Sequence, residues 1–225
     1  MIGVQLASWF ASLPDSVLRG SLYSVASESR LAAAIVLAAN GCAVHADMIV
    51  SATGEHVGVS PAELLAVRAA LPNARIDVHL MLVDDLYLDG QSDAVGDVVR
   101  TAEAVGAERV ATSPALLDLP GDVFAGLRRA GIAVWIEVGP RHDGSGLPRD
   151  DVDGALVMFI QPGSTDTADP THLDKLARLA TLLPVGVDGG VTAELAAVSV
   201  EAGASFIVSG RALLETFQNP TATLS

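Results

Sequence analysis

Two imidazoles and two carboxylates stand at or near the ends of short apolar segments of this chain. His45 and Asp47 are two residues apart, His79 lies within the run Asp77–Met81, and Asp188 precedes a pair of glycines. Nitrogen and oxygen ligands of this kind suit Zn²⁺, Fe²⁺, Mn²⁺ or Co²⁺. Each residue alone also has a structural explanation, as a hydrogen-bonded histidine or a helix-capping aspartate. Together, the four predict a site for a divalent metal ion.

The elements that must bring these residues together are strands alternating with helices. The apolar runs are short and rich in Ala, Val, Leu and Ile, which is typical of strands covered by helices on both faces. Helices are expected over Pro61–Ala70, after Ser60, and over Pro170–Leu183, with Asp169 as the cap. Strands are expected at Ile2–Leu6, Ala43–Asp47, Arg75–Met81, Arg109–Thr112, Ala133–Glu137, Ala155–Ile160, Val185–Asp188 and Ser205–Val208.

Eight alternating units in 225 residues favour a closed TIM (β/α)8 barrel over an open sheet. No linker, repeat or shift in composition divides the chain, so we expect one domain over residues 1–225. The side chains at the C-terminal ends of barrel strands converge on one mouth. His45, Asp47, His79 and Asp188 are therefore expected to meet there.

Three motifs give the chain a resemblance to a known family. They read His45-Ala46-Asp47, Asp77-Val78-His79-Leu80-Met81 and Val187-Asp188-Gly189-Gly190-Val191, and their order resembles that of the ribulose-phosphate 3-epimerases. The resemblance implies a barrel of the ribulose-phosphate-binding type, and a metal held by His45, Asp47, His79 and Asp188. It also implies that Asp47 and Asp188 act as acid and base at C3 of a ketopentose phosphate, through a metal-stabilised enediolate. The expected reaction interconverts D-ribulose 5-phosphate and D-xylulose 5-phosphate in the pentose phosphate pathway.

Substrate-binding residues are expected around this centre. The segment Gln161–Asp166 keeps only the Pro-Gly of the family's glycine-rich phosphate loop, and Arg211 follows Gly210 where the family commonly has Gly-Ser. We expect a helix to begin there and, with Arg211, to bind the phosphate. Gln5 takes the place of the family's substrate-contacting serine. The predicted substrate-binding set is Gln5, Ser8, Met81, Met158, Gly163, Gly189, Gly190, Gly210 and Arg211.

Composition narrows the possible partners and locations. A net charge of −14 argues against nucleic acid or an anionic membrane as a partner, because both favour clustered Lys and Arg. The only lysine, Lys175, falls in a surface-helix pattern, which excludes a Schiff-base aldolase. Cys42 has no partner for an internal disulfide. We expect a cytoplasmic protein that acts on a small sugar phosphate. Homo-oligomer formation stays open, because the irregular segment Ser8–Ser27 could close over the site or pack against another subunit.

Alternative functions stay open at this point. The related hexulose-phosphate synthases and orotidine-phosphate decarboxylases also use a Gly-Arg phosphate site, but they need a lysine where this chain has His79. An epimerase-like barrel for a different sugar phosphate, or a non-catalytic sugar-phosphate-binding homologue, would explain the altered phosphate loop.

Overall fold

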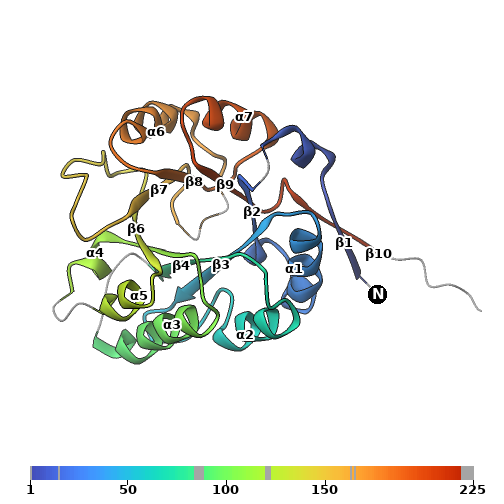
Figure 1. Ribbon diagram of the computed structural model, residues 1–225, viewed down its shortest axis with the longest axis horizontal. Coiled ribbons are helices and arrows are strands. Elements are labelled where there is room, and N and C mark those ends of the chain that lie inside the picture. The colour runs from blue at the N-terminus through green and yellow to red at the C-terminus, as the bar shows by residue number, and fades with distance from the viewer. Residues whose placement is uncertain are drawn as a thin grey trace, which may run out of the picture.

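Parallel strands close into a barrel in the computed structural model (Figure 1), which describes residues 2–14, 16–83, 89–119, 123–162, 164 and 166–218. Each barrel strand pairs in parallel with the next along the chain, and the last pairs with the first. Within the described residues the barrel has eight strands: β2 (Leu18–Ser21), β3 (Ala43–Val50), β4 (Ile76–Leu82), β5 (Arg109–Thr112), β6 (Ala133–Val138), β7 (Gly154–Met158), β8 (Val185–Asp188) and β9 (Phe206–Ser209). The predicted barrel fold is confirmed.

Helices surround the barrel on its outer side (Figure 1). The α-helices are α1 (Arg30–Ala39), α2 (Pro61–Ala70), α3 (Ser92–Ala104), α4 (Pro114–Leu117), α5 (Ala125–Arg129), α6 (Leu173–Ala180) and α7 (Ala193–Glu201). Short 3-10 helices occur at η1 (Ser8–Ser12), η2 (Leu22–Ser24), η3 (Ser27–Ser29), η5 (Asp89–Gln91) and η6 (Pro170–His172). None of the helices in the described ranges is long and apolar enough to cross a membrane.

Helix α2 shows how local sequence sets the element boundaries. Ser60 accepts a hydrogen bond from the backbone N–H of Glu63, and the Glu63 carboxylate accepts one from the backbone N–H of Ser60. Pro61 occupies the first helical position, where its missing N–H costs nothing. The helix therefore begins where the sequence predicts. The predicted cap at Asp169 is also present, although it precedes η6 and α6 rather than one continuous helix.

One predicted strand does not belong to the barrel. β1 (Ile2–Leu6) pairs antiparallel with β10 (Leu214–Gln218) in a separate two-stranded ribbon, which extends to the side of the barrel in Figure 1. The first barrel strand is instead β2, within the segment that the sequence presented as irregular. The prediction was wrong because β2 is only four residues long and includes Arg19, Gly20 and Ser21.

The side chain of Arg19 is buried inside the barrel, where it contacts an acidic and an aromatic side chain. Its guanidinium forms an ion pair with Asp77 in β4 and lies 4.4 Å from the centroid of the Phe206 ring. Arg109 in β5 also pairs with Asp77, at 3.1 Å, and lies over the rings of Trp135 and Phe206. These side chains fill the N-terminal end of the barrel. The space for chemistry lies at the opposite mouth.

Candidate metal centre and substrate pocket

The four predicted metal ligands meet at the C-terminal mouth of the barrel. Within the described residues, His45, Asp47, His79 and Asp188 form a cluster whose potential ligand atoms all lie within 4.8 Å of one another. His45 and Asp47 point the same way because alternate residues of a strand share a face, here that of β3. His79 comes from β4 and Asp188 from the end of β8. Three strands that are far apart in sequence thus supply one constellation.

The ligand atoms face a common centre. His45 Nε2 lies 3.4 Å from Asp47 Oδ1 and 3.6 Å from Asp188 Oδ2. His79 Nδ1 lies 3.5 Å and 3.7 Å from the same two oxygens. Both nitrogens are buried and have no hydrogen-bond partner within the described part of the chain. Buried polar atoms normally have a partner, so two unpaired nitrogens facing two carboxylate oxygens fit a divalent cation.

The electrostatics of this cluster follow from its burial and its charges. Burial opposes ionisation of Asp47, but the neighbouring His45 and His79 outweigh it and lower the pKa of Asp47. Burial likewise lowers the pKa of His79, but the carboxylates of Asp188, Asp47 and Glu137 outweigh this effect and raise that pKa well above its usual value. Asp47 and His79 therefore each favour the charged form of the other.

Glu137 is a member of the site that sequence reasoning missed. Its Oε2 lies 2.9 Å from His79 Nε2, on the side of the ring opposite Nδ1, and the residue is only 4% exposed. The signal was present in the sequence as one acidic residue inside the apolar strand Ala133–Val138. That signal does not identify a partner, because His79 lies 58 residues away in the chain.

Ser21 was also missed as a site residue. Its hydroxyl donates a 2.6 Å hydrogen bond to Asp47 Oδ2, the carboxylate oxygen that does not face the histidines. Ser21 occupies the end of β2, the strand that the sequence did not reveal. It thus stands where a barrel strand end reaches the site, the place that the sequence analysis had given to Gln5.

A turn of two glycines holds Asp188 in place. Gly189 has φ +100° and Gly190 φ +67°, a backbone region that residues other than glycine rarely adopt. The backbone N–H of Gly189 donates a 2.6 Å hydrogen bond to Asp188 Oδ1. A Cβ on Gly189 would lie 2.8 Å from the backbone nitrogen of Ile160, so the neighbouring loop leaves no room for one. The glycine pair therefore orients the carboxylate and lets the loop after β7 approach it.

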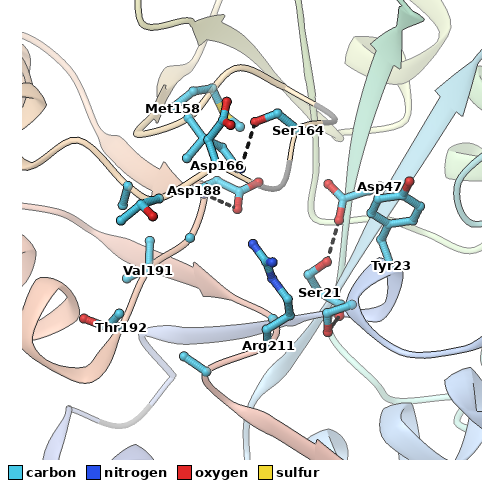
Figure 2. A pocket seen from close by; sticks show the side chains of 18 of the residues that line it. Ser21, Tyr23, Asp47, Met158, Ser164, Asp166, Asp188, Val191, Thr192 and Arg211 are labelled. Atoms are coloured by element: carbon cyan, nitrogen blue, oxygen red, sulfur yellow. Dashed lines mark hydrogen bonds between the residues drawn. The ribbon is translucent and has the colours of Figure 1, made fainter.

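A pocket of about 730 Å³ opens above the metal-ligand cluster (Figure 2). Asp47 and Asp188 line it, and Figure 2 shows Arg211 pointing into it. Of the predicted substrate-binding residues, those that line the pocket are Met81, Met158, Gly189, Gly190, Gly210 and Arg211. Residues that line it without having been predicted include Tyr23, Ser24, Ser164, Asp166 and Thr192.

Other predicted substrate contacts are not brought to the pocket. Gln5 lies in the β1–β10 ribbon, where its side chain donates a 2.8 Å hydrogen bond to Glu215, and Ser8 is exposed at the start of η1. Neither residue is among those that line the pocket. Both expectations depended on Ile2–Leu6 being a barrel strand, and the structure instead places this strand in the ribbon with β10. Gly163 lies outside the described residues.

The helix expected after Gly210 is absent from the described residues 210–218. The backbone N–H groups of Leu213 and Leu214 both bond to the carbonyl of Gly210, closing a single turn. The chain then extends into β10, because pairing with β1 satisfies its backbone instead. Arg211 and the Gly210 backbone remain at the pocket, but no helix terminus supports them from that side.

The sequence of this chain matches the profile of a known protein family. The profile of the Ribulose-phosphate 3 epimerase family matches residues 20–214, a range that leaves out nearly all of the β1–β10 ribbon. No curated protein matches the chain significantly.

Solved structures share the fold of this chain at low sequence identity. A mutant tryptophan synthase alpha-subunit from Pyrococcus furiosus has 18% identity and a TM-score of 0.61, with 88% of this chain and 87% of that chain covered. A phosphoribosyl anthranilate isomerase from Thermus thermophilus has 16% identity and a TM-score of 0.57, with 86% of each chain covered. Identities this low show the fold and not the reaction.

Proposed function

Because this chain belongs to the ribulose-phosphate 3-epimerase family, we propose that it is a metal-dependent epimerase of a ketose phosphate. The first pair of substrates to test is D-ribulose 5-phosphate and D-xylulose 5-phosphate. The observation that carries the proposal is the position of Asp47 and Asp188, which both contribute to the ligand cluster and both line the pocket. Two carboxylates so placed can move protons at one substrate carbon.

His45, Asp47, His79 and Asp188 would hold the cation. A bound divalent ion supplies positive charge that stabilises negative charge developing on a substrate oxygen. The two unpaired histidine nitrogens are the donors expected for Zn²⁺, Fe²⁺, Mn²⁺ or Co²⁺.

The acid and base roles fall to the two aspartates. One carboxylate takes the proton from C3 of the ketose phosphate, and the other returns a proton to the opposite face of the resulting enediolate. Asp47 is oriented for this by the Ser21 hydroxyl, and Asp188 by the Gly189 backbone. Fixed orientation matters because proton transfer requires the carboxylate within hydrogen-bond distance of the reacting carbon's proton.

The phosphate would be bound at the rim of the pocket. Arg211 offers a charged fork of donors, and the backbone of Gly189, Gly190 and Gly210 allows close approach of an anion. Ser164 lines the same pocket.

Asp166 favours a second candidate within the same reaction class. Asp166 lines the pocket in the loop after β7, where its carboxylate would repel a nearby phosphate dianion but could accept hydrogen bonds from sugar hydroxyls. A longer or differently configured ketose phosphate, whose hydroxyls meet Asp166 while its phosphate meets Arg211, would suit both charges.

The test is deuterium incorporation from solvent at C3 of D-ribulose 5-phosphate and of a panel of longer ketose phosphates. Metal content is measured on the same protein sample, before and after chelation. We expect exchange on at least one member of the panel, loss of exchange after chelation, and recovery when Mn²⁺, Co²⁺, Fe²⁺ or Zn²⁺ is restored. Bound metal without exchange on any ketose phosphate would contradict the proposed reaction.

A further inference from the structure

The two histidines of the metal-ligand cluster differ in the hydrogen-bond partners of their ring nitrogens. Both nitrogens of His45 are buried without a hydrogen-bond partner among the residues that the structure describes, whereas the Nε2 of His79 meets a buried carboxylate, that of Glu137, at 2.9 Å. His79 is on β4 and Glu137 on β6, and β5 lies between these two strands in the barrel. The contact therefore crosses the barrel interior and is not a consequence of strand pairing.

This contact decides how His79 presents itself to the cluster. An ionised carboxylate has no proton to donate and can only accept a hydrogen bond. In this contact Nε2 of His79 is therefore the donor and carries the proton. The remaining nitrogen, Nδ1, is the one that faces Asp47 and Asp188. His45 presents the other type of nitrogen, Nε2, to the same oxygens.

We propose that Glu137 is a positioning residue of the metal centre, which makes Nδ1 the metal-binding nitrogen of His79 and strengthens its binding to the cation. The inference rests on the metal centre of the proposed function, but not on which sugar phosphate is the substrate. A histidine that donates its second N–H to a carboxylate is held in one orientation and is a more basic ligand, and loss of such a partner typically weakens metal binding about 10–100-fold.

A purely structural role of Glu137 predicts a different experimental result. If Glu137 only neutralised a buried histidine, its replacement would change the stability of the metal-free protein and leave the geometry and affinity of the metal site unchanged. Metal binding is therefore the decisive measurement.

The experiment compares full-length wild type, Glu137→Gln and Glu137→Leu in the metal-free state, titrated with Co²⁺. The dissociation constant and the visible ligand-field spectrum of the bound ion are recorded. The matched control is Glu108→Gln, which removes a carboxylate paired at 2.7 Å with Arg75, outside the metal-ligand cluster.

We expect Glu137→Leu to raise the Co²⁺ dissociation constant about 10–100-fold and to alter the spectrum. Glu137→Gln should bind more tightly than Glu137→Leu and keep a spectrum close to that of wild type, because its amide oxygen can still accept from Nε2. Glu108→Gln should bind Co²⁺ as wild type does. A Glu137→Leu protein with the affinity and spectrum of wild type would overturn the inference.

A second measurement needs no variant, in case Glu137→Leu does not fold. Long-range ¹H–¹⁵N correlation spectra of the Zn²⁺-loaded wild type identify which nitrogen of each histidine binds the metal. We expect Nδ1 for His79 and Nε2 for His45, and binding through Nε2 of His79 would contradict the inference. Neither measurement uses a substrate, so absence of turnover on every ketose phosphate would refute the proposed reaction alone. A wild type that binds no metal would refute both.

Discussion

Asp47 and Asp188 hold their carboxylates in the same way, although they lie 141 residues apart in the chain. In each, one oxygen accepts a short hydrogen bond, from the Ser21 hydroxyl to Asp47 Oδ2 and from the Gly189 N–H to Asp188 Oδ1, both 2.6 Å. In each, the other oxygen faces both histidines. This matched arrangement suits two groups that would exchange roles when the proposed reaction runs in reverse.

Asp188→Asn is expected to slow proton exchange severely while the protein stays folded. The amide oxygen can still accept from the Gly189 N–H, but an amide cannot serve as base, so the exchange rate should fall about 10²–10⁴-fold or more. The rate is measured by deuterium incorporation, and folding by thermal melting. Asp174→Asn, on the exposed side of α6, is the control. Undiminished exchange in Asp188→Asn would rule out the assigned role.

Ser21→Ala should slow exchange without unfolding the barrel. The substitution removes the hydrogen bond to the Asp47 carboxylate, and a bond to a charged group contributes about 1.5–3 kcal/mol, so a roughly tenfold or greater loss is expected. Ser24→Ala is not a suitable control because Ser24 lines the pocket. Ser12→Ala, whose hydroxyl donates a hydrogen bond to the nearby Trp9 carbonyl, is the better one. Equal rates in both variants would remove Ser21 from the mechanism.

Arg211→Ala should weaken the binding of phosphorylated substrate more than it slows the reaction. Loss of a charge-assisted contact to phosphate is expected to raise KM about tenfold or more. Arg211→Lys should recover only part of this, because an ammonium lacks the forked donors of a guanidinium. Steady-state kinetics distinguish KM from kcat, with the exposed Arg100→Ala in α3 as control. A KM that stays at the wild-type value would place the phosphate elsewhere.

Asp77→Ala should destabilise the barrel rather than act at the site. Asp77 belongs to the string that carries the family resemblance, yet its carboxylate pairs with Arg19 and Arg109 at the other end of the barrel. Removing one partner of a buried ion pair costs about 3–5 kcal/mol. Urea unfolding measures the loss. Asp97→Ala breaks an exposed pair on α3 and should change stability by less than about 1 kcal/mol. Comparable effects of the two variants would contradict this role.

The stability of the N-terminus of α2 should depend on acidic pH through Glu63. Burial favours its neutral form, but hydrogen bonds from Ser27 and Ser60 and the charge of Arg30 outweigh this and lower its pKa to about 2. A lowered pKa in the folded state stabilises the fold above the ordinary pKa and loses that effect as the pH falls from about 4.5 to about 2. Glu63→Gln should therefore lower the free energy of unfolding by about 1–3 kcal/mol at pH 7.

Urea titrations of wild type and Glu63→Gln at pH 7 and pH 3 test this. The difference between the two proteins should shrink at the lower pH. If the difference in the free energy of unfolding does not depend on pH, the charge of Glu63 does not contribute, and the prediction is contradicted.

Several features of the fold and site could be predicted from the sequence because their causes are local. His45 and Asp47 share a face by the two-residue period of a strand, and Ser60 begins α2 through contacts within four residues. The alternation of apolar runs and helix patterns was enough to predict the barrel, and seven of the eight predicted strands lie in it.

Tertiary structure alone decided the features that depend on partners far away in the chain. β2 contains Arg19, whose burial in a barrel strand depends on its contacts with Asp77 and Phe206. Ser21 reaches Asp47 because β2 pairs with β3, and Glu137 on β6 reaches His79 on β4 across the barrel interior. A lone serine or glutamate in a strand carries no sign of its partner in the sequence. The sequence by itself predicted the four residues of the metal-ligand cluster, and the closed barrel decided what orients them.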